Sequence, residues 1–222
     1  MPSRNIIKTY LENGIYHIYN RGANKQPIFY DEQDHAVFSS YLKEYLMPKD
    51  EKYLMGILAD PMINWKEKDK ALKLLRLNNF NDEITMLCHT LMPNHFHFLV
   101  KQKLKDAIDR FMHSLGTRYT MFFNKKYKHI GPLYQSTYKA VMIESDEQLL
   151  YTTGYIHRNP LGDNLASQGV TLQRFLQRLL SQPSSLPEYL GQRKTEWIHP
   201  EEILSYFSKT NTRLDYLSFM QQ

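Results

Sequence analysis

Two kinds of apolar pattern divide the first two thirds of the chain into segments whose structure can be predicted. Four short segments alternate or run apolar as β-strands do, namely 14–22, 84–92, 95–101 and 133–143. Two longer segments, 31–46 and 104–127, repeat apolar residues every three or four positions, which predicts helices. Pro93 and Asn94 separate the second and third strands, so we expect a β-hairpin there.

A further helix is predicted after the fourth strand. Ser145 and Gln148 have the spacing of a capping box, and Pro160 must end the helix near residue 158. The order of elements is therefore β-α-β-β-α-β followed by a helix. This order predicts an α+β fold of the ferredoxin-like, split βαβ type, with helices on one face of an antiparallel sheet.

The rest of the chain is predicted to form additions to this core. We place the core at 1–165, with an insertion near 48–81 in which residues 66–77 form a short helix. Residues 166–222 contain a Ser/Pro-rich stretch and short helical patterns. They predict a mostly helical C-terminal extension that packs on the core.

Charge is concentrated in one part of the chain. The formal net charge is +5, and residues 101–128 hold eight Lys and Arg against two Asp. A basic segment in an aromatic-rich chain suits nucleic acid, and a solvated helix face explains it equally well. The single cysteine, Cys88, is expected to be buried and fits a reducing compartment. No long apolar run suggests a membrane span, so we expect a cytoplasmic protein.

Two histidines in the hairpin are the first candidates for chemistry. His95 and His97 lie one residue apart in a strand, so they share a face with their Cα atoms roughly 6.5 to 7 Å apart. Two imidazoles in this arrangement can bind one metal ion. Paired histidines also occur as ordinary hydrogen-bonded residues, so the pair alone leaves both readings open.

The helix before Pro160 carries the second set of candidates. Tyr151, Tyr155 and Asn159 follow at intervals of four and share one helix face. Taken alone, this is a packing stripe with a polar end. Beside a histidine pair, the same stripe predicts a phenol nucleophile and, one turn further on, a neutral metal ligand.

These residues carry a resemblance to a known family. The stretches "MPNHFHFLV" and "YIHRNP" resemble the HUH signature of single-tyrosine transposases, and more narrowly the REP-associated tyrosine transposases. Further similar stretches are "YHIYNRGANKQPIFYDEQDH", "FMHSLGTRYTMFFNKKY", "GPLYQSTYKA" and "YLGQRKTEWIHPEEILSYF". The chain departs from the family at Thr137, where relatives often have Arg, and the segment 48–81 is longer than the family leads us to expect.

The resemblance implies roles for individual residues. His95 and His97 correspond to the metal-binding pair, Asn159 to the helix-borne ligand and Tyr155 to the nucleophile, with Tyr151 as its rival. It implies Mg²⁺ or Mn²⁺, and cleavage of single-stranded DNA through a 5′-phosphotyrosine that allows strand transfer. A free phenol has a pKa of about 10, so Tyr155 needs help to lose its proton, from the metal or a bound water.

The expected partner is single-stranded DNA with hairpin-forming repeat ends, bound by a monomer or a homodimer. Candidates for contacts with the DNA backbone are Arg21, Lys101, Lys103, Lys105, Arg110, Arg118, Lys125, Lys126 and Lys139. The alternative function is a catalytically silent protein that binds single-stranded DNA hairpins and regulates repeats. A third reading, a metal-dependent hydrolase without a covalent step, does not need Tyr155.

Overall fold

A four-stranded antiparallel sheet forms the centre of the protein. The computed structural model describes residues 10–161, 171–207 and 212–220. The strands are β1 (Ile15–Arg21), β2 (Ile84–Met92), β3 (His95–Gln102) and β4 (Lys139–Ile143), in the spatial order β2-β3-β1-β4. Helices α1 (Glu32–Leu46) and α4 (Ala107–Tyr127) make the two crossovers. The predicted α+β, split βαβ fold is confirmed.

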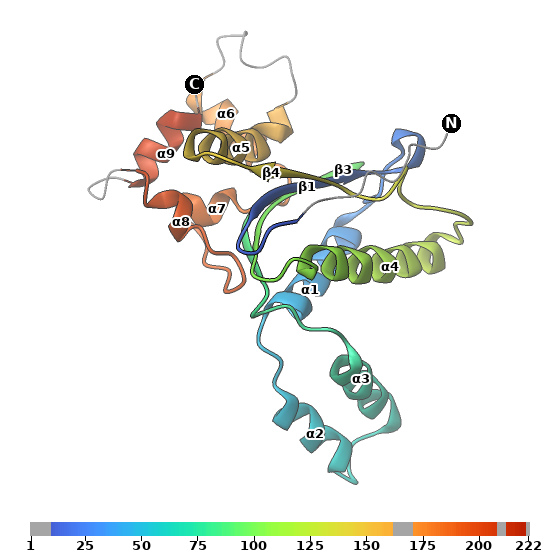
Figure 1. Cartoon of the computed structure of the whole chain (residues 1–222). Helices are drawn as coiled ribbons and strands as arrows, with labels where there is room; N and C mark the ends of the chain where they lie inside the picture. Colours follow the sequence, from blue (N-terminus) through green and yellow to red (C-terminus); the bar gives the residue numbers. More distant parts are fainter. Residues whose placement is uncertain (1–9, 162–170, 208–211, 221–222) are drawn as a thin grey trace.

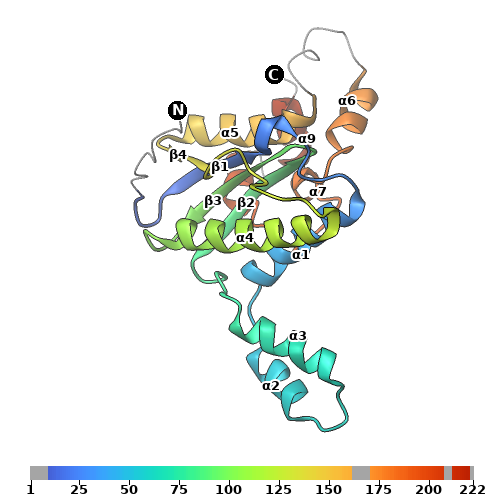
Figure 2. The same ribbon diagram turned by 90° about the vertical axis from the view of Figure 1, so that its right-hand side faces the viewer.

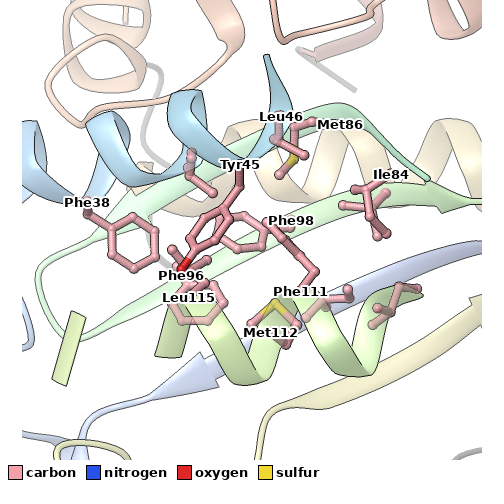
Figure 3. Close-up of a cluster of buried hydrophobic side chains, with 14 of the residues drawn as sticks. Phe38, Tyr45, Leu46, Ile84, Met86, Phe96, Phe98, Phe111, Met112 and Leu115 are labelled. Atoms are coloured by element: carbon pink, nitrogen blue, oxygen red, sulfur yellow. The ribbon is translucent and has the colours of Figure 1, made fainter. Parts of the chain in front are cut away.

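The face of the sheet toward α1 and α4 carries the larger hydrophobic core (Figures 1 and 3). Phe96 and Phe98 of β3 point to this face, because side chains alternate along a strand. Phe98 lies beside Phe38 of α1, with ring centroids 6.2 Å apart, and both rings are fully buried. Phe111 and Met112 of α4 close the cluster from the other helix (Figure 3). This core holds the hairpin and both crossover helices together.

The opposite face of the sheet is covered as well, whereas the sequence analysis placed the helices of the core on one face only. Helix α5 (Asp146–Arg158) packs there, together with the C-terminal helices (Figure 1). The latter are α6 (Leu172–Leu179), α7 (Leu186–Tyr189), α8 (Glu201–Leu204) and α9 (Thr212–Met220). Cys88 is buried in this second core, as predicted. The predicted division near residue 165 lies outside the described residues.

The start of α5 follows the predicted capping box. Ser145 Oγ accepts a hydrogen bond from the Gln148 backbone N–H at 3.2 Å. The Gln148 side-chain oxygen accepts in return from the Glu144 N–H at 2.8 Å. Two otherwise unpaired N–H groups are therefore satisfied at the first turn, and the helix starts at a defined residue.

The segment between α1 and β2 forms a helical hairpin that projects from the sheet (Figure 2). Its helices are α2 (Glu51–Ala59) and α3 (Trp65–Arg76), so the predicted short helix at 66–77 is confirmed. Leu54 and Ala71 are the buried residues of these two helices, which contact each other along the hairpin. At the base, Lys49 Nζ donates to the carbonyl oxygens of Leu75 and Leu77 at 3.0 and 2.5 Å.

The fourth strand is shorter than the predicted 133–143, since β4 covers only its last five residues. Residues 133–138 contact the core and the end of β1 instead. Leu133 is buried, and Tyr134 and Tyr138 pack against the α1/α4 core. The Ser136 carbonyl accepts from Asn20 Nδ2 at 3.2 Å. The regular ladder with β1 therefore ends at Lys139, and the preceding segment contacts the end of β1 again through the isolated Gly22–Tyr134 bridge.

A buried polar network joins α5 to the C-terminal helices. His157 Nδ1 lies 2.5 Å from the Tyr216 hydroxyl, and His157 Nε2 lies 2.9 Å from Ser185 Oγ. Ser185 Oγ also accepts from the backbone N–H of His89 at 2.8 Å. Buried polar groups are costly unless they are paired, so these bonds hold α5, β2 and the C-terminal helices in one arrangement. No described helix is both long and apolar enough to cross a membrane.

Replacing a core ring at the centre of the sheet tests this packing. Phe98→Ala removes a fully buried ring, and we expect it to lower the free energy of unfolding by about 3–5 kcal/mol. Chemical denaturation measures the change. Met62→Ala is the control, because Met62 is 88% exposed and its loss should change stability by less than about 0.5 kcal/mol. Equal stability of the two variants would contradict the described core.

Buried His89 predicts a specific pH dependence of stability. Burial lowers the pKa of His89 to about 3, whereas an exposed histidine titrates near about 6.5. Between these values only the unfolded chain takes up the proton, so stability falls as the pH is lowered. In His89→Phe, we expect the slope of unfolding free energy against pH between about pH 4 and 6 to fall by up to about 1.4 kcal/mol per unit.

Urea unfolding at several pH values measures this slope. His113→Phe is the control, because His113 is exposed on α4 and its removal should leave the slope as in the wild type. An unchanged slope in His89→Phe would contradict a buried, neutral imidazole at this position.

Candidate functional site

Backbone hydrogen bonds fix the turn between β2 and β3, directly before the histidine pair. The Pro93 carbonyl accepts from the backbone N–H groups of Ile28 and Phe29 at 2.8 and 3.0 Å. The Asn94 carbonyl accepts from the Gly22 N–H at 2.9 Å. A side chain at Gly22 would collide with the Gln26 backbone, since a Cβ there would lie 2.1 Å from the Gln26 carbonyl oxygen. Glycine therefore allows the close approach that fixes the turn.

His95 and His97 point toward α5, on the face opposite Phe96 and Phe98. Their ring centroids lie 5.0 Å apart. Asn159, at the end of α5, reaches both rings: its Oδ1 lies 2.9 Å from His95 Nε2, and its Nδ2 lies 3.4 Å from His97 Nε2. The structure thus brings together the three side chains that the sequence singled out as metal ligands.

The charge state of these rings suits metal binding. Burial lowers the pKa of His97 to about 2 and also lowers that of His95. Both rings are neutral at pH 7, and each has one N–H and one lone pair. His95 faces two oxygens, Asn94 Oδ1 at 2.6 Å and Asn159 Oδ1 at 2.9 Å. One ring N–H cannot serve both, so a ring lone pair faces an amide oxygen.

The spacing of these groups is compatible with shared coordination of a cation. Adjacent ligands of an octahedral ion with bonds of about 2.1 Å lie about 3 Å apart. The 2.9 Å between His95 Nε2 and Asn159 Oδ1 matches this spacing. No group of three or more His, Cys, Asp and Glu side chains suited to a metal occurs among the described residues. Any site here therefore depends on the amide of Asn159 as its third ligand.

The two candidate tyrosines on α5 differ in their position relative to the histidines. The Tyr155 ring stands perpendicular to His97, with centroids 5.6 Å apart, and 6.0 Å from His17. It is 41% exposed. Tyr151 is 65% exposed, and within the described part of the chain its ring contacts neither histidine. Tyr155 is thus both accessible and adjacent to the histidine pair.

Two residues of β1 belong to the site and were missed in the sequence. His17 Nε2 lies 2.8 Å from His97 Nδ1, and burial lowers the pKa of His17 to about 4. Tyr19 lies directly opposite His97 in the strand register, and the two rings stack with centroids 5.6 Å apart. The alternation of "YHIYNRG" puts both on one face. The strand pairing that aligns them with His97 could not be read from one segment.

Two of the predicted DNA-binding cations lie beside the histidines. Arg21 is exposed and pairs with His95 in the β1–β3 register. Lys139 is exposed on β4, with its Nζ 5.8 Å from the centre of the Tyr19 ring. Both side chains lie on the face of the sheet that carries the histidines. They place positive charge next to the site without entering it.

The other predicted cations lie elsewhere. Lys101 pairs with Glu202 at 2.9 Å, Arg118 with Glu44 at 2.5 Å, and Lys126 with Asp31 at 2.7 Å. Arg110 pairs with Glu83 and Asp106. Arg110, Arg118, Lys125 and Lys126 belong to α4, which covers the opposite face of the sheet. Lys103 and Lys105 are exposed just before α4. The basic segment is therefore not gathered around the histidines.

A cavity of about 570 Å³ opens on the α1/α4 side of the sheet. Aromatic rings line it, among them Phe38, Phe96, Tyr134 and Tyr138, and Thr137 also borders it. Phe96 points into this face whereas its neighbours His95 and His97 point away from it. The sheet therefore separates this cavity from the histidine site.

One family model matches the part of the chain that carries the motifs. Residues 60–159, from α3 to the end of α5, match the family described as "Transposase IS200 like". No curated protein sequence gives a significant match. Among solved structures the chain is similar to a REP-associated tyrosine transposase bound to a REP hairpin, with 12% identity over 78% of this chain and 86% of that one, and a TM-score of 0.41. The matched segment 60–159 contains the histidine pair, Tyr155 and Asn159, so the similarity to IS200-like transposases covers every residue of the candidate site that the sequence singled out.

Proposed function

We propose that the protein nicks single-stranded DNA and transfers the cut strand through a 5′-phosphotyrosine at Tyr155. The observation that carries this proposal is the position of the Tyr155 ring, 5.6 Å from His97 and one helical turn before Asn159. A nucleophile, two imidazoles and an amide thus meet at one partly exposed point. The match of residues 60–159 to a transposase family model supports the same class of reaction.

The chemistry assigned to Tyr155 is attack on a phosphodiester. Its phenolic oxygen forms a bond to phosphorus while the bond to the 3′ oxygen breaks, leaving a 5′-phosphotyrosine and a free 3′-hydroxyl. The phenol loses its proton to water, and the 3′ oxygen gains one. One phosphodiester replaces another, so a second 3′-hydroxyl can reverse the step and join a new strand. No external energy source is needed.

His95, His97 and Asn159 are the residues that would hold the divalent ion. We propose Mg²⁺ or Mn²⁺, because an amide oxygen and phosphate oxygens suit hard cations. Such an ion supplies Lewis acidity toward the phosphate oxygens. The chain's own part is to hold two neutral imidazoles and one amide in fixed positions, and to bury His97 while leaving Tyr155 accessible to DNA.

The proposed substrate is DNA with hairpin-forming repeat ends, processed in the cytoplasm at the nucleoid. Single-stranded segments suit the site because Tyr19, His17 and Tyr155 present aromatic rings beside the cations Arg21 and Lys139. The oligomeric proposal is a monomer, since Tyr155 and the histidine pair already lie together within one chain.

Replacing the phenol tests the covalent step. With a single-stranded hairpin oligonucleotide and Mn²⁺, wild-type protein should give a covalent protein–DNA band on a denaturing gel. Tyr155→Phe should abolish the band, because the ring remains but the nucleophilic oxygen is lost. Tyr151→Phe is the matched control, one turn earlier on α5, and should keep the band.

The result also separates the competing functions. Loss of the band in Tyr151→Phe but not in Tyr155→Phe would contradict the assignment of the nucleophile. Cleavage without a covalent band, retained in Tyr155→Phe, would indicate a metal-dependent hydrolase. Tight hairpin binding with neither cleavage nor a covalent band in the wild type would indicate the silent DNA-binding protein.

The cations beside the histidines predict a salt-dependent contribution to binding. Each phosphate contact with a single strand contributes a slope of roughly 0.7 to the fall of log affinity with log salt. We expect Arg21→Gln and Lys139→Gln each to weaken binding of a hairpin oligonucleotide and to reduce this slope by about that amount. Fluorescence anisotropy at several salt concentrations measures it.

Lys52→Gln is the control for this measurement. Lys52 is exposed on α2, in the projecting helical hairpin, and its loss should leave the slope unchanged. A slope that stays at the wild-type value in both Arg21→Gln and Lys139→Gln would show that DNA does not pass over this side of the site.

A further inference from the structure

The contact between His17 and His97 has a consequence for the metal site of the proposed function. The two ring nitrogens lie 2.8 Å apart, and the ring planes are inclined by only 23°. A bond between two neutral imidazoles needs one N–H and one lone pair. The position of the single proton therefore determines which nitrogen of His97 is available as a ligand.

The geometry around His97 identifies that nitrogen. Its Nδ1 faces His17, whereas its Nε2 faces Asn159 at 3.4 Å, on the side where His95 and Asn159 converge. Ligation through Nε2 requires the proton of His97 on Nδ1. His97 is then the donor in this bond, and His17 Nε2 is the acceptor. His17 must in turn carry its own proton on Nδ1.

We propose that His17 is a positioning residue that holds His97 in the Nδ1–H form, with Nε2 directed at the ion. This inference rests on the proposed metal site. The partners of metal-bound histidines fix both the tautomer and the orientation of the ring. In the absence of the His17 acceptor, His97 can take the other tautomer, whose Nε2–H blocks the ligand atom.

The fold explains why the partner is at position 17. Tyr19 lies directly opposite His97 across the β1–β3 pair, so His17 is the diagonal neighbour on the same face. Its ring also contacts the edge of Tyr155, at 6.0 Å between centroids. His17 thus touches a proposed ligand and the proposed nucleophile at once.

An imidazole at position 17 also has an electrostatic advantage over a carboxylate. Metal-bound histidines often donate to a carboxylate, which would add a negative charge beside the anionic phosphate that must approach Tyr155. A neutral imidazole accepts the same hydrogen bond without this repulsion. His17 therefore orients His97 without repelling the DNA phosphate.

Binding of Mn²⁺ to the DNA-free protein tests the proposal without relying on activity. His17→Phe keeps a ring but removes the acceptor, and should weaken Mn²⁺ binding by roughly 10- to 100-fold in calorimetry or electron paramagnetic resonance. His17→Gln supplies an amide oxygen that can accept the bond, and should recover most of the affinity. His113→Phe, which removes an exposed histidine of α4, should bind Mn²⁺ as the wild type does.

A spectroscopic measurement on the unmutated protein covers the case in which a variant fails to fold. ¹⁵N-labelled histidine NMR with Mg²⁺ should show His97 protonated on Nδ1. Protonation of His97 on Nε2, or unchanged Mn²⁺ affinity in a folded His17→Phe, would overturn the inference.

These outcomes are distinct from failure of the proposed function. Weakened Mn²⁺ binding in His17→Phe with no covalent band from the wild type would support the role of His17 and reject the transposase chemistry. A covalent band that returns in His17→Phe at saturating Mn²⁺ supports both. A wild type that binds no Mn²⁺ would overturn the metal site, and the role of His17 with it.

Discussion

The pairing of β3 between β1 and β2 is the constraint on which the rest of the structure depends. Side chains alternate along β3, so Phe96 and Phe98 enter the core against α1 and α4 while His95 and His97 face α5. A slip of one residue would exchange the two sets and bury two imidazoles among apolar side chains. The hydrophobic core therefore enforces the register, and the register sets the spacing of the histidines.

The second requirement is the position of α5, which carries Tyr155 and Asn159. Thr90 of β2 lies opposite His97, and its hydroxyl donates to the Ile156 carbonyl at 2.8 Å. One residue further along, His157 is hydrogen-bonded to Ser185, which precedes α7, and to Tyr216 of α9. The same turn of helix is thus anchored from the sheet and from the C-terminal region. Tyr155 points away from these anchors, toward the histidines.

The electrostatics of the site follow from this packing. Burial, followed by the charge of nearby groups including Arg21, keeps the pKa of His95 and His97 low. The imidazoles are therefore available as neutral ligands, and the fixed positive charges of Arg21 and Lys139 stand outside them. This division suits the proposed DNA substrate, because the cations would attract its phosphate while the neutral groups would hold the proposed ion.

Much of the fold and of the candidate site could be predicted from the sequence, because these features depend on neighbours along the chain. Strand alternation placed His95 and His97 on one face, helical periodicity placed Tyr155 and Asn159 one turn apart, and the Ser145 capping box located the start of α5. Tertiary structure alone decided the rest. The pairing of β1 with β3 brought His17 to His97, and residues 133–138 interrupt the regular ladder between β1 and β4. Cations of α4 such as Arg118 form ion pairs far from the site. These depend on contacts between residues distant in sequence, and local periodicity carries no information about which distant segment a side chain will meet.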